Sequence, residues 1–152
     1  MHYHFTDTHL ALRESVRQMV NKEIRPIAAQ LDATDRFPEE LVPIFGDMGL
    51  LQVLVPEEYG GPGGDVTSAC IAREEIAKAS SACSLLAGQC SIGFVLPLLH
   101  FGTEEQRQRW LPLGAEGRTL TAVAITEPEA GSDVGSMRTN ARRDGDSHII
   151  NG

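Results

Sequence analysis

The ten residues AITEPEAGSD, at positions 124–133, lie just beyond the point at which the chain changes from helical to strand-like periodicity. They follow a short apolar run, 120–125, and are rich in small and hydroxylated side chains. Such a loop places backbone N–H groups and the hydroxyls of Thr126 and Ser132 close to a ligand, and free N–H groups in an irregular turn suit phosphate oxygens. Composition alone favours a plain polar connection between two strands. The order of the residues must therefore decide between such a connection and a ligand-binding loop.

The sequence before residue 117 predicts helices. Residues 7–31 carry apolar side chains at the i, i+3, i+4 spacing of an amphipathic helix, with Thr6 or Asp7 as its N-cap and a bend at Pro26. The stretch Phe37-Pro38-Glu39-Glu40 opens a second helix, with proline in its first turn and acids at the positive end of the helix dipole. Further helices are expected over 65–79, 81–100 and 103–113, with N-caps at Asp65 or Thr67, at Ser80 or Ser81, and at Thr103.

The sequence after residue 117 predicts strands. The run 120–125 has the composition of a buried strand, and 137–143 and 147–150 predict two more, joined by a hairpin turn at Asp144-Gly145-Asp146. Another hairpin signal, Asn151-Gly152, stands at the end of the chain. Three short strands leave a sheet edge without a partner. We therefore expect a mainly α, truncated chain, with a helical domain at 1–117 and the incomplete start of a β domain at 118–152.

The composition argues against several kinds of partner and site. The formal charge of −8, with scattered basic residues, argues against nucleic acid. The cysteines Cys70, Cys83 and Cys90 lack metal-ligand spacing and suit the reduced thiols of a cytosolic protein, and the histidines also lack ligand partners, so no metal site is predicted. No secretory segment opens the chain, and the most apolar run, 92–101, is too short to span a bilayer. We expect a soluble, cytoplasmic protein.

The order of residues 124–133 resembles the flavin-contacting signature of the acyl-CoA dehydrogenase family. Further landmarks of that family stand in its order and at about its spacing: PEEYGG at 56–61, FGTEEQ at 101–106, WLP at 110–112, Thr139, Ala141, Gly145-Asp146 and Asn151-Gly152. The central motif is specific, whereas each flanking piece would be weak alone. The likeness covers essentially the whole chain, and it implies an orthogonal helical bundle followed by the first strands of a β-barrel-like domain.

The resemblance also implies a cofactor site for FAD. In that family the central β domain supports the isoalloxazine ring, and the acyl-CoA thioester lies against the flavin between the helical and β domains. Backbone groups of 123–126 would bond the pyrimidine side of the ring, and the Thr126 hydroxyl would bond a ring heteroatom. The implied flavin contacts are Val123, Ala124, Ile125, Thr126, Gly131 and Ser132. The family often has an aromatic residue where this chain has Val123, which weakens the inference about how that position packs on the cofactor.

The predicted helix 81–100 corresponds, by the same resemblance, to a wall of the acyl pocket. Small residues such as Gly88 and Gly93, with Gln89 between them, would set the depth of the pocket. The implied substrate contacts are Gln89 and Gly93, together with Ser132 beside the flavin phosphate and the pantetheine arm of CoA. Small residues in a buried helix also simply permit close helix packing, and this alternative stays open.

None of the acids in the loop is assigned as the catalytic base. Removal of the α-proton from an acyl thioester needs a carboxylate, and Glu127, Glu129 and Asp133 are the nearest candidates in sequence. The family places that glutamate in a C-terminal helical domain, beyond residue 152. Glu127, next to Pro128, is instead expected to hold the loop by accepting hydrogen bonds from backbone N–H groups.

The resemblance implies the N-terminal portion of an FAD-dependent acyl-CoA dehydrogenase, which converts an acyl-CoA to the trans-2-enoyl-CoA. An electron-transferring flavoprotein would reoxidise the flavin, and the full-length enzyme would be a homo-oligomer. Residues 1–152 alone are expected to hold FAD poorly and to be inactive. The alternatives are an acyl-CoA oxidase or flavin monooxygenase on the same scaffold, and a non-catalytic helical interaction module.

Overall fold

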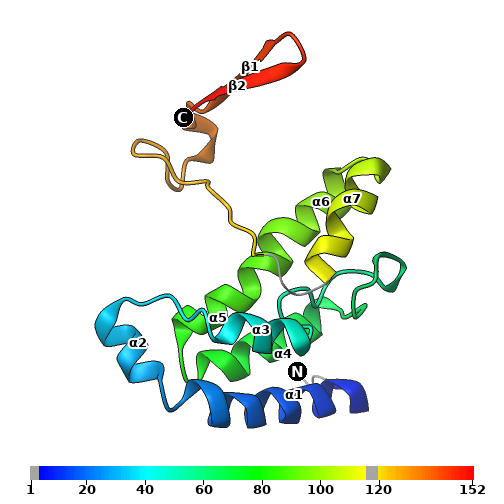
Figure 1. Cartoon of the computed structure of the whole chain (residues 1–152), viewed down its shortest axis with the longest axis vertical. Helices are drawn as coiled ribbons and strands as arrows, with labels where there is room; N and C mark the ends of the chain where they lie inside the picture. Colours follow the sequence, from blue (N-terminus) through cyan, green and yellow to red (C-terminus); the bar gives the residue numbers. More distant parts are fainter. Residues whose placement is uncertain (1–3, 116–119) are drawn as a thin grey trace. The chain divides into compact units, whose positions relative to one another are not determined.

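The structure, a computed structural model, describes residues 4–115 and 120–152 and has a helical part followed by a hairpin (Figure 1). Two compact units are present, Met1–Ala122 and Val123–Gly152. The expected mainly α fold with strands at the C-terminal end is confirmed. The expected domain boundary between residues 117 and 118 lies outside the described residues and stays a prediction.

The helices of the first unit follow one another with short connections. They are α1 (Asp7–Met19), the π-helical η1 (Val20–Ile24), α2 (Ala28–Thr34), α3 (Leu41–Asp47), the 3-10 turn η2 (Glu57–Tyr59), α4 (Val66–Ala77), α5 (Ser81–Gly88), the π-helical η3 (Gln89–Val95), α6 (Leu96–Phe101) and α7 (Glu104–Ala115). The second unit contains the 3-10 turn η4 (Val134–Ser136) and the strands β1 (Asn140–Asp144) and β2 (Ser147–Asn151).

Side-chain caps begin the helices where the sequence predicted them. The Thr6 hydroxyl accepts from the N–H of residue 9 at 3.2 Å, Asp65 from that of residue 68 at 2.7 Å, and Ser80 from that of residue 83 at 3.2 Å. Thr103 and Gln106 form a reciprocal capping box, in which each side chain accepts from the other residue's N–H. Each cap satisfies an N–H group that has no partner within the helix.

The first long helix is interrupted before Pro26, as expected. Its final turn widens into η1, in which the N–H of Arg25 donates to the carbonyl of Val20, and α2 begins only at Ala28. Proline has no N–H to continue the helical ladder, and its ring clashes with the carbonyl one turn earlier. The region 7–31 is therefore two α-helices joined by a π-helical turn.

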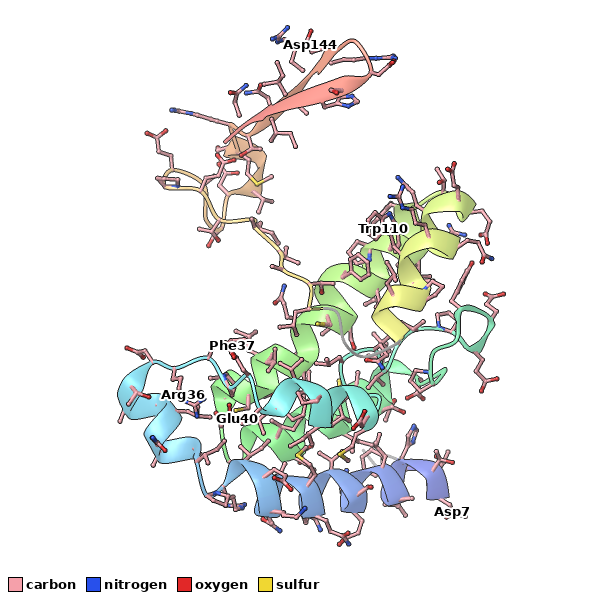
Figure 2. The ribbon with its side chains drawn as sticks, viewed as in Figure 1. Asp7, Arg36, Phe37, Glu40, Trp110 and Asp144 are labelled. Carbon is pink, nitrogen blue, oxygen red and sulfur yellow. The ribbon has the colours of Figure 1, made fainter. Side chains whose placement is uncertain are left out.

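The second predicted helix begins three residues later than expected, at Leu41 rather than Pro38. Pro38 lies in a tight turn, where its carbonyl accepts from the N–H of Leu41 at 3.0 Å. Across this turn the Arg36 guanidinium donates to both carboxylate oxygens of Glu40, at 2.7 and 2.9 Å (Figure 2). That pairing lowers the pKa of Glu40 to about 2. The expected role of these acids inside a first helical turn is therefore wrong for Glu40, which precedes the helix and binds Arg36.

The most apolar helix ends one residue beyond its expected bounds of 81–100. α5, η3 and α6 form one continuous helix, Ser81–Phe101, of 21 residues with a mean hydropathy of 1.8, which meets the length and composition of a membrane-crossing helix. The apolar run 92–101, which was expected to be too short to span a bilayer, is the C-terminal half of this helix. The helix nevertheless contributes Cys83, Ala87 and Cys90 to one hydrophobic cluster and Val95 to another. These contacts account for its composition as that of a core helix.

Two hydrophobic clusters hold the first unit together. α4 packs against both α1 and α5, and the larger cluster fills the space among these helices and α3 (Figure 1). The smaller cluster joins the connection 53–59 to η3 and α7 through residues including Val55, Val95 and Leu111. The buried hydroxyl of Ser91 donates to the carbonyl of Leu51 at 3.1 Å and joins η3 to the segment between α3 and η2.

A buried carboxylate reinforces the contact between α1 and α4. Glu75 of α4 has only 2% of its side chain exposed, and its oxygens accept from Arg17 of α1 at 3.1 and 3.2 Å and from Lys78 at 2.7 Å. The hydrogen bond from Arg17 holds the pKa of Glu75 below its usual range. A buried charge is tolerated only when it is paired in this way.

The second unit is a hairpin, and its first expected strand is absent. Residues 120–125 are not in a strand, since no strand in the described part of the chain pairs with them. β1 and β2 pair antiparallel from Asn140 opposite Asn151 to Asp144 opposite Ser147, with Gly145 at φ 60° in the turn. β1 begins three residues later than expected, because the amides of Arg138 and Thr139 bond a side chain and are not free for a strand ladder.

We predict that Glu75→Gln lowers the free energy of unfolding by about 2 kcal/mol at neutral pH, because the guanidinium and ammonium groups around it lose their buried anion. Urea unfolding measures the change. The difference from the wild type holds above the unfolded-state pKa of glutamate, about 4.3, and disappears as the pH falls through the lowered folded-state pKa of Glu75. Glu74→Gln is the matched control, since Glu74 is 60% exposed and forms its ion pair with Lys78. Equal effects of the two substitutions would contradict the prediction.

Candidate functional site in the loop 123–139 and along the core helix

The centre of the loop is a tight turn. The N–H of Glu127 donates to the carbonyl of Ala130 at 3.0 Å, and the N–H of Ala130 donates back at 3.2 Å, with Pro128 and Glu129 at the corner. Ala130 is 2% exposed, whereas the residues on either side of the turn are exposed. The order Glu-Pro-Glu-Ala thus forms a closed turn in which Ala130 is the one buried side chain.

Glu127 holds this turn to the chain that follows it. Its two carboxylate oxygens accept from the N–H groups of Arg138 at 2.7 Å and Thr139 at 2.9 Å. These bonds, with that from Arg138 first, keep the pKa of Glu127 below its ordinary value. The expectation that Glu127 binds backbone N–H groups is confirmed, and a carboxylate held as a hydrogen-bond acceptor in this way is a poor proton acceptor.

The other two acids of the loop also have partners within it. Glu129 forms an ion pair with the Arg138 guanidinium at 2.6 Å, in which both side chains are exposed. The carboxylate of Asp133, just before η4, accepts from the hydroxyl of Ser136 at the end of that turn. All three acids are therefore engaged in shaping the loop, which agrees with assigning the catalytic base to none of them.

The residues expected to contact a flavin form an open surface. Residues 123–126 are extended and exposed, Val123 by 37% and Ile125 by 53%, and form no backbone–backbone hydrogen bond within the described residues. Gly131 and Ser132 follow the turn and are also exposed. A Cβ at Gly131 would meet nothing within 4 Å, so the unit itself does not require glycine there. The segment offers unpaired backbone groups and the Thr126 hydroxyl to a ligand.

The residues expected to contact the acyl chain lie in the first unit. Gln89 and Gly93 are both half-buried in η3, and the segment widens there into a π-helix, a feature often found at functional sites. A cavity of about 10 Å³ lies beside this segment, but neither residue lines it. Its walls are Leu50, Val53, Ala69, Ala72, Arg73, Ala87, Gly88, Ser91 and Ile92.

Sequence reasoning named Gly88 but missed Arg73. Arg73 lies on α4, and a signal was present in the sequence, since it follows Ala69 and Ala72 on an otherwise apolar face that continues to Ile76. A charged residue on the buried stripe of a helix is unusual unless it has a partner. A search of each helix face for such exceptions would have found it.

Comparison with known proteins identifies relatives of this chain. Residues 6–118 match the family model described as acyl-CoA dehydrogenase, N-terminal domain. An acyl-CoA dehydrogenase of Bacillus subtilis (strain 168) is 41% identical over 150 residues, which are 98% of this chain and 39% of that protein. The chain therefore spans about 40% of the length of this relative.

Solved structures share the fold. The glutaryl-coenzyme A dehydrogenase in its glutaryl-CoA complex superposes with a TM-score of 0.91 at 37% identity, over 100% of this chain and 39% of that one. An acyl-CoA dehydrogenase complexed with FAD from Bacillus anthracis superposes with a TM-score of 0.87 at 33% identity, over 97% of this chain and 26% of that one.

We predict that Glu127→Gln speeds hydrogen exchange at the amides of Arg138 and Thr139, because a neutral amide has one acceptor oxygen where the carboxylate has two. Exchange followed by NMR measures the effect. Glu129→Gln is the matched control, since its carboxylate pairs with the exposed Arg138 side chain and bonds neither of the two amides. Unchanged exchange at both amides in the Glu127 variant would show that this carboxylate does not hold the loop.

Proposed function

Because the chain belongs to the acyl-CoA dehydrogenase family, we propose that it forms the N-terminal part of an FAD-dependent acyl-CoA dehydrogenase. The reaction removes the α-hydrogen of an acyl-CoA as a proton and the β-hydrogen as a hydride, and leaves the trans-2-enoyl-CoA. FAD, when bound, supplies the hydride acceptor. The single observation that carries the proposal is the match of residues 6–118 to the family's N-terminal domain.

The exposed segment 123–126 fits the edge of a flavin ring. Its backbone groups are unpaired within the described residues, and its side chains are small or aliphatic, so a planar ring can approach closely. In this proposal the backbone of 123–126 and the hydroxyl of Thr126 bond the ring, and Gly131 and Ser132 lie on its phosphate side. Donors held toward a flavin stabilise the charge that develops as hydride arrives.

The acyl-CoA substrate is assigned to Ser132 and to the face of η3 that carries Gln89 and Gly93. Ser132 would contact the pantetheine arm, and the two η3 residues would border the acyl chain. Their half-buried positions leave part of each available for contact. No acid of the loop is assigned as the base for the α-proton, because Glu127, Glu129 and Asp133 are engaged in holding the loop.

The remaining features of the whole enzyme follow from the family and are proposals. An electron-transferring flavoprotein is the proposed acceptor of electrons from the reduced flavin, and the complete enzyme is a homo-oligomer in the cytoplasm. An acyl-CoA oxidase on the same scaffold would differ in one measurable respect, the rapid reoxidation of its flavin by air.

Anaerobic titration of the purified full-length protein with acyl-CoA tests the proposal. We predict that the protein carries oxidised flavin, that acyl-CoA bleaches its absorbance with formation of enoyl-CoA, and that air restores the colour slowly. Residues 1–152 expressed alone are expected to bind FAD weakly and to show no turnover. A colourless full-length protein, or one whose flavin no acyl-CoA bleaches, would reject the proposed activity.

We predict that Thr126→Val in the full-length protein raises the Kd for FAD about 3- to 10-fold, the effect of one lost neutral hydrogen bond. Equilibrium binding to the apoprotein measures this change. Thr34→Val is the matched control, because it removes the same hydroxyl from α2, where it donates to the carbonyl of Gln30. Equal Kd values for the two variants would exclude a flavin contact for Thr126.

A further inference from the structure

The second unit has almost no hydrophobic core to hold its loop. In Val123–Gly152, every residue of which the structure describes, Ala130 is the one buried residue and Glu127 the one half-buried residue. Burial of apolar surface, which stabilises the first unit, therefore contributes little to the shape of this loop. Polar contacts must hold it, because a loop that has to be ordered when a ligand binds lowers the affinity for that ligand.

The turn at the centre of the loop joins the two groups of proposed flavin contacts. The backbone groups of Glu127 and Ala130 pair with each other at 3.0 and 3.2 Å and close the turn. Thr126 directly precedes the first residue of this pair, and Gly131 directly follows the second. The contacts on both sides of the turn therefore leave one closed unit, and the interaction that orients this unit orients both of them.

The carboxylate of Glu127 is the strongest tie between this turn and the rest of the unit. Its oxygens accept from the N–H groups of Arg138 at 2.7 Å and Thr139 at 2.9 Å, eleven and twelve residues further along the chain. Hydrogen bonds to an ionised acceptor are roughly twice as strong as bonds between neutral groups. The ion pair of Glu129 with Arg138 joins the same segments, but its side chains are 63% and 79% exposed and it contributes little.

We propose that Glu127 is a positioning residue for the flavin. Its carboxylate holds Thr126 and the open backbone of 123–126 in the orientation that binds the ring, and it acts through these groups rather than by contact with the cofactor. This inference rests on the proposed function, since it takes 123–126 to be the segment that FAD meets. Affinity falls with the fraction of protein in the binding-competent conformation, so a loosened turn weakens FAD binding even when every contacting group is present.

Equilibrium binding of FAD to the full-length apoprotein tests this assignment. Glu127→Ala removes both acceptor oxygens and should raise the Kd for FAD about 10- to 100-fold, the effect of a lost charge-assisted hydrogen bond. Glu127→Gln keeps one acceptor oxygen and should give an intermediate Kd. Glu129→Gln is the matched control and should leave the Kd at the wild-type value, because it removes the same charge two residues away without touching the two amide bonds.

A double-mutant cycle with Thr126→Val separates positioning from a general loss of stability. In the wild-type background this substitution should raise the Kd about 3- to 10-fold. In the Glu127→Ala background it should raise the Kd by about 2-fold or less, because the Thr126 hydroxyl is no longer held toward the ring. A merely structural role of Glu127 would leave the two effects independent, and their fold-changes would multiply. The same cycle with Glu127→Gln serves where Glu127→Ala does not fold.

The outcomes distinguish this inference from the proposed function. A Kd that Glu127→Ala leaves unchanged, or a Thr126→Val effect of equal size in both backgrounds, would overturn the inference while FAD binding stands. A wild-type full-length protein that binds no FAD would instead reject the proposed function, and this inference with it.

Discussion

The continuous helix Ser81–Phe101 is the constraint on which the first unit depends. One helix supplies buried residues to both hydrophobic clusters, so the positions of α1, α3 and α4 on one side and of the connection 53–59 and α7 on the other are all set against it. Burial of its apolar side chains stabilises the unit by roughly 1.5–3 kcal/mol for each large residue that is fully enclosed. Its π-helical middle carries Gln89, Gly93 and a wall of the cavity, so the same element serves both core and candidate site.

Neighbouring charges on α4 have opposite situations. Glu75 is enclosed and partnered by Arg17 and Lys78, and its bond to Arg17 adds a buried polar contact between α1 and α4. Arg73 lies two positions earlier, faces the core helix, and keeps a buried donor without a partner. The Glu75 arrangement has a structural role, because its partners compensate the buried charge. The second arrangement leaves Arg73 Nε without an acceptor among the described residues.

Acidic side chains hold the loop of the second unit in shape, while backbone groups of residues 123–126 form no backbone–backbone hydrogen bond among the described residues. The carboxylate of Glu127 accepts from the N–H groups of Arg138 and Thr139. These groups are therefore not free for a strand ladder, and no strand forms at 137–139 before the hairpin. The segment 123–126 before the turn keeps its own amides and carbonyls unpaired among the described residues. A carboxylate engaged by two backbone amides and a segment with unpaired backbone groups agree with the proposal that this loop contacts a cofactor and supplies no base.

The sequence by itself determined the helices, their caps, the hairpin and the family, because each depends on local order: a Ser, Thr or Asp before an apolar periodic run, a Gly-Asp turn, the wording of residues 124–133. Only the tertiary structure decided that 120–125 lacks a strand partner, that helix α3 starts at Leu41, and that the helix Ser81–Phe101 contributes to two hydrophobic clusters. It also decided the meeting of Arg73 with Gly88, fifteen positions apart in sequence on different helices. Such pairings arise from packing between segments, and a local pattern carries no record of which distant side chain will fill the space that a glycine leaves.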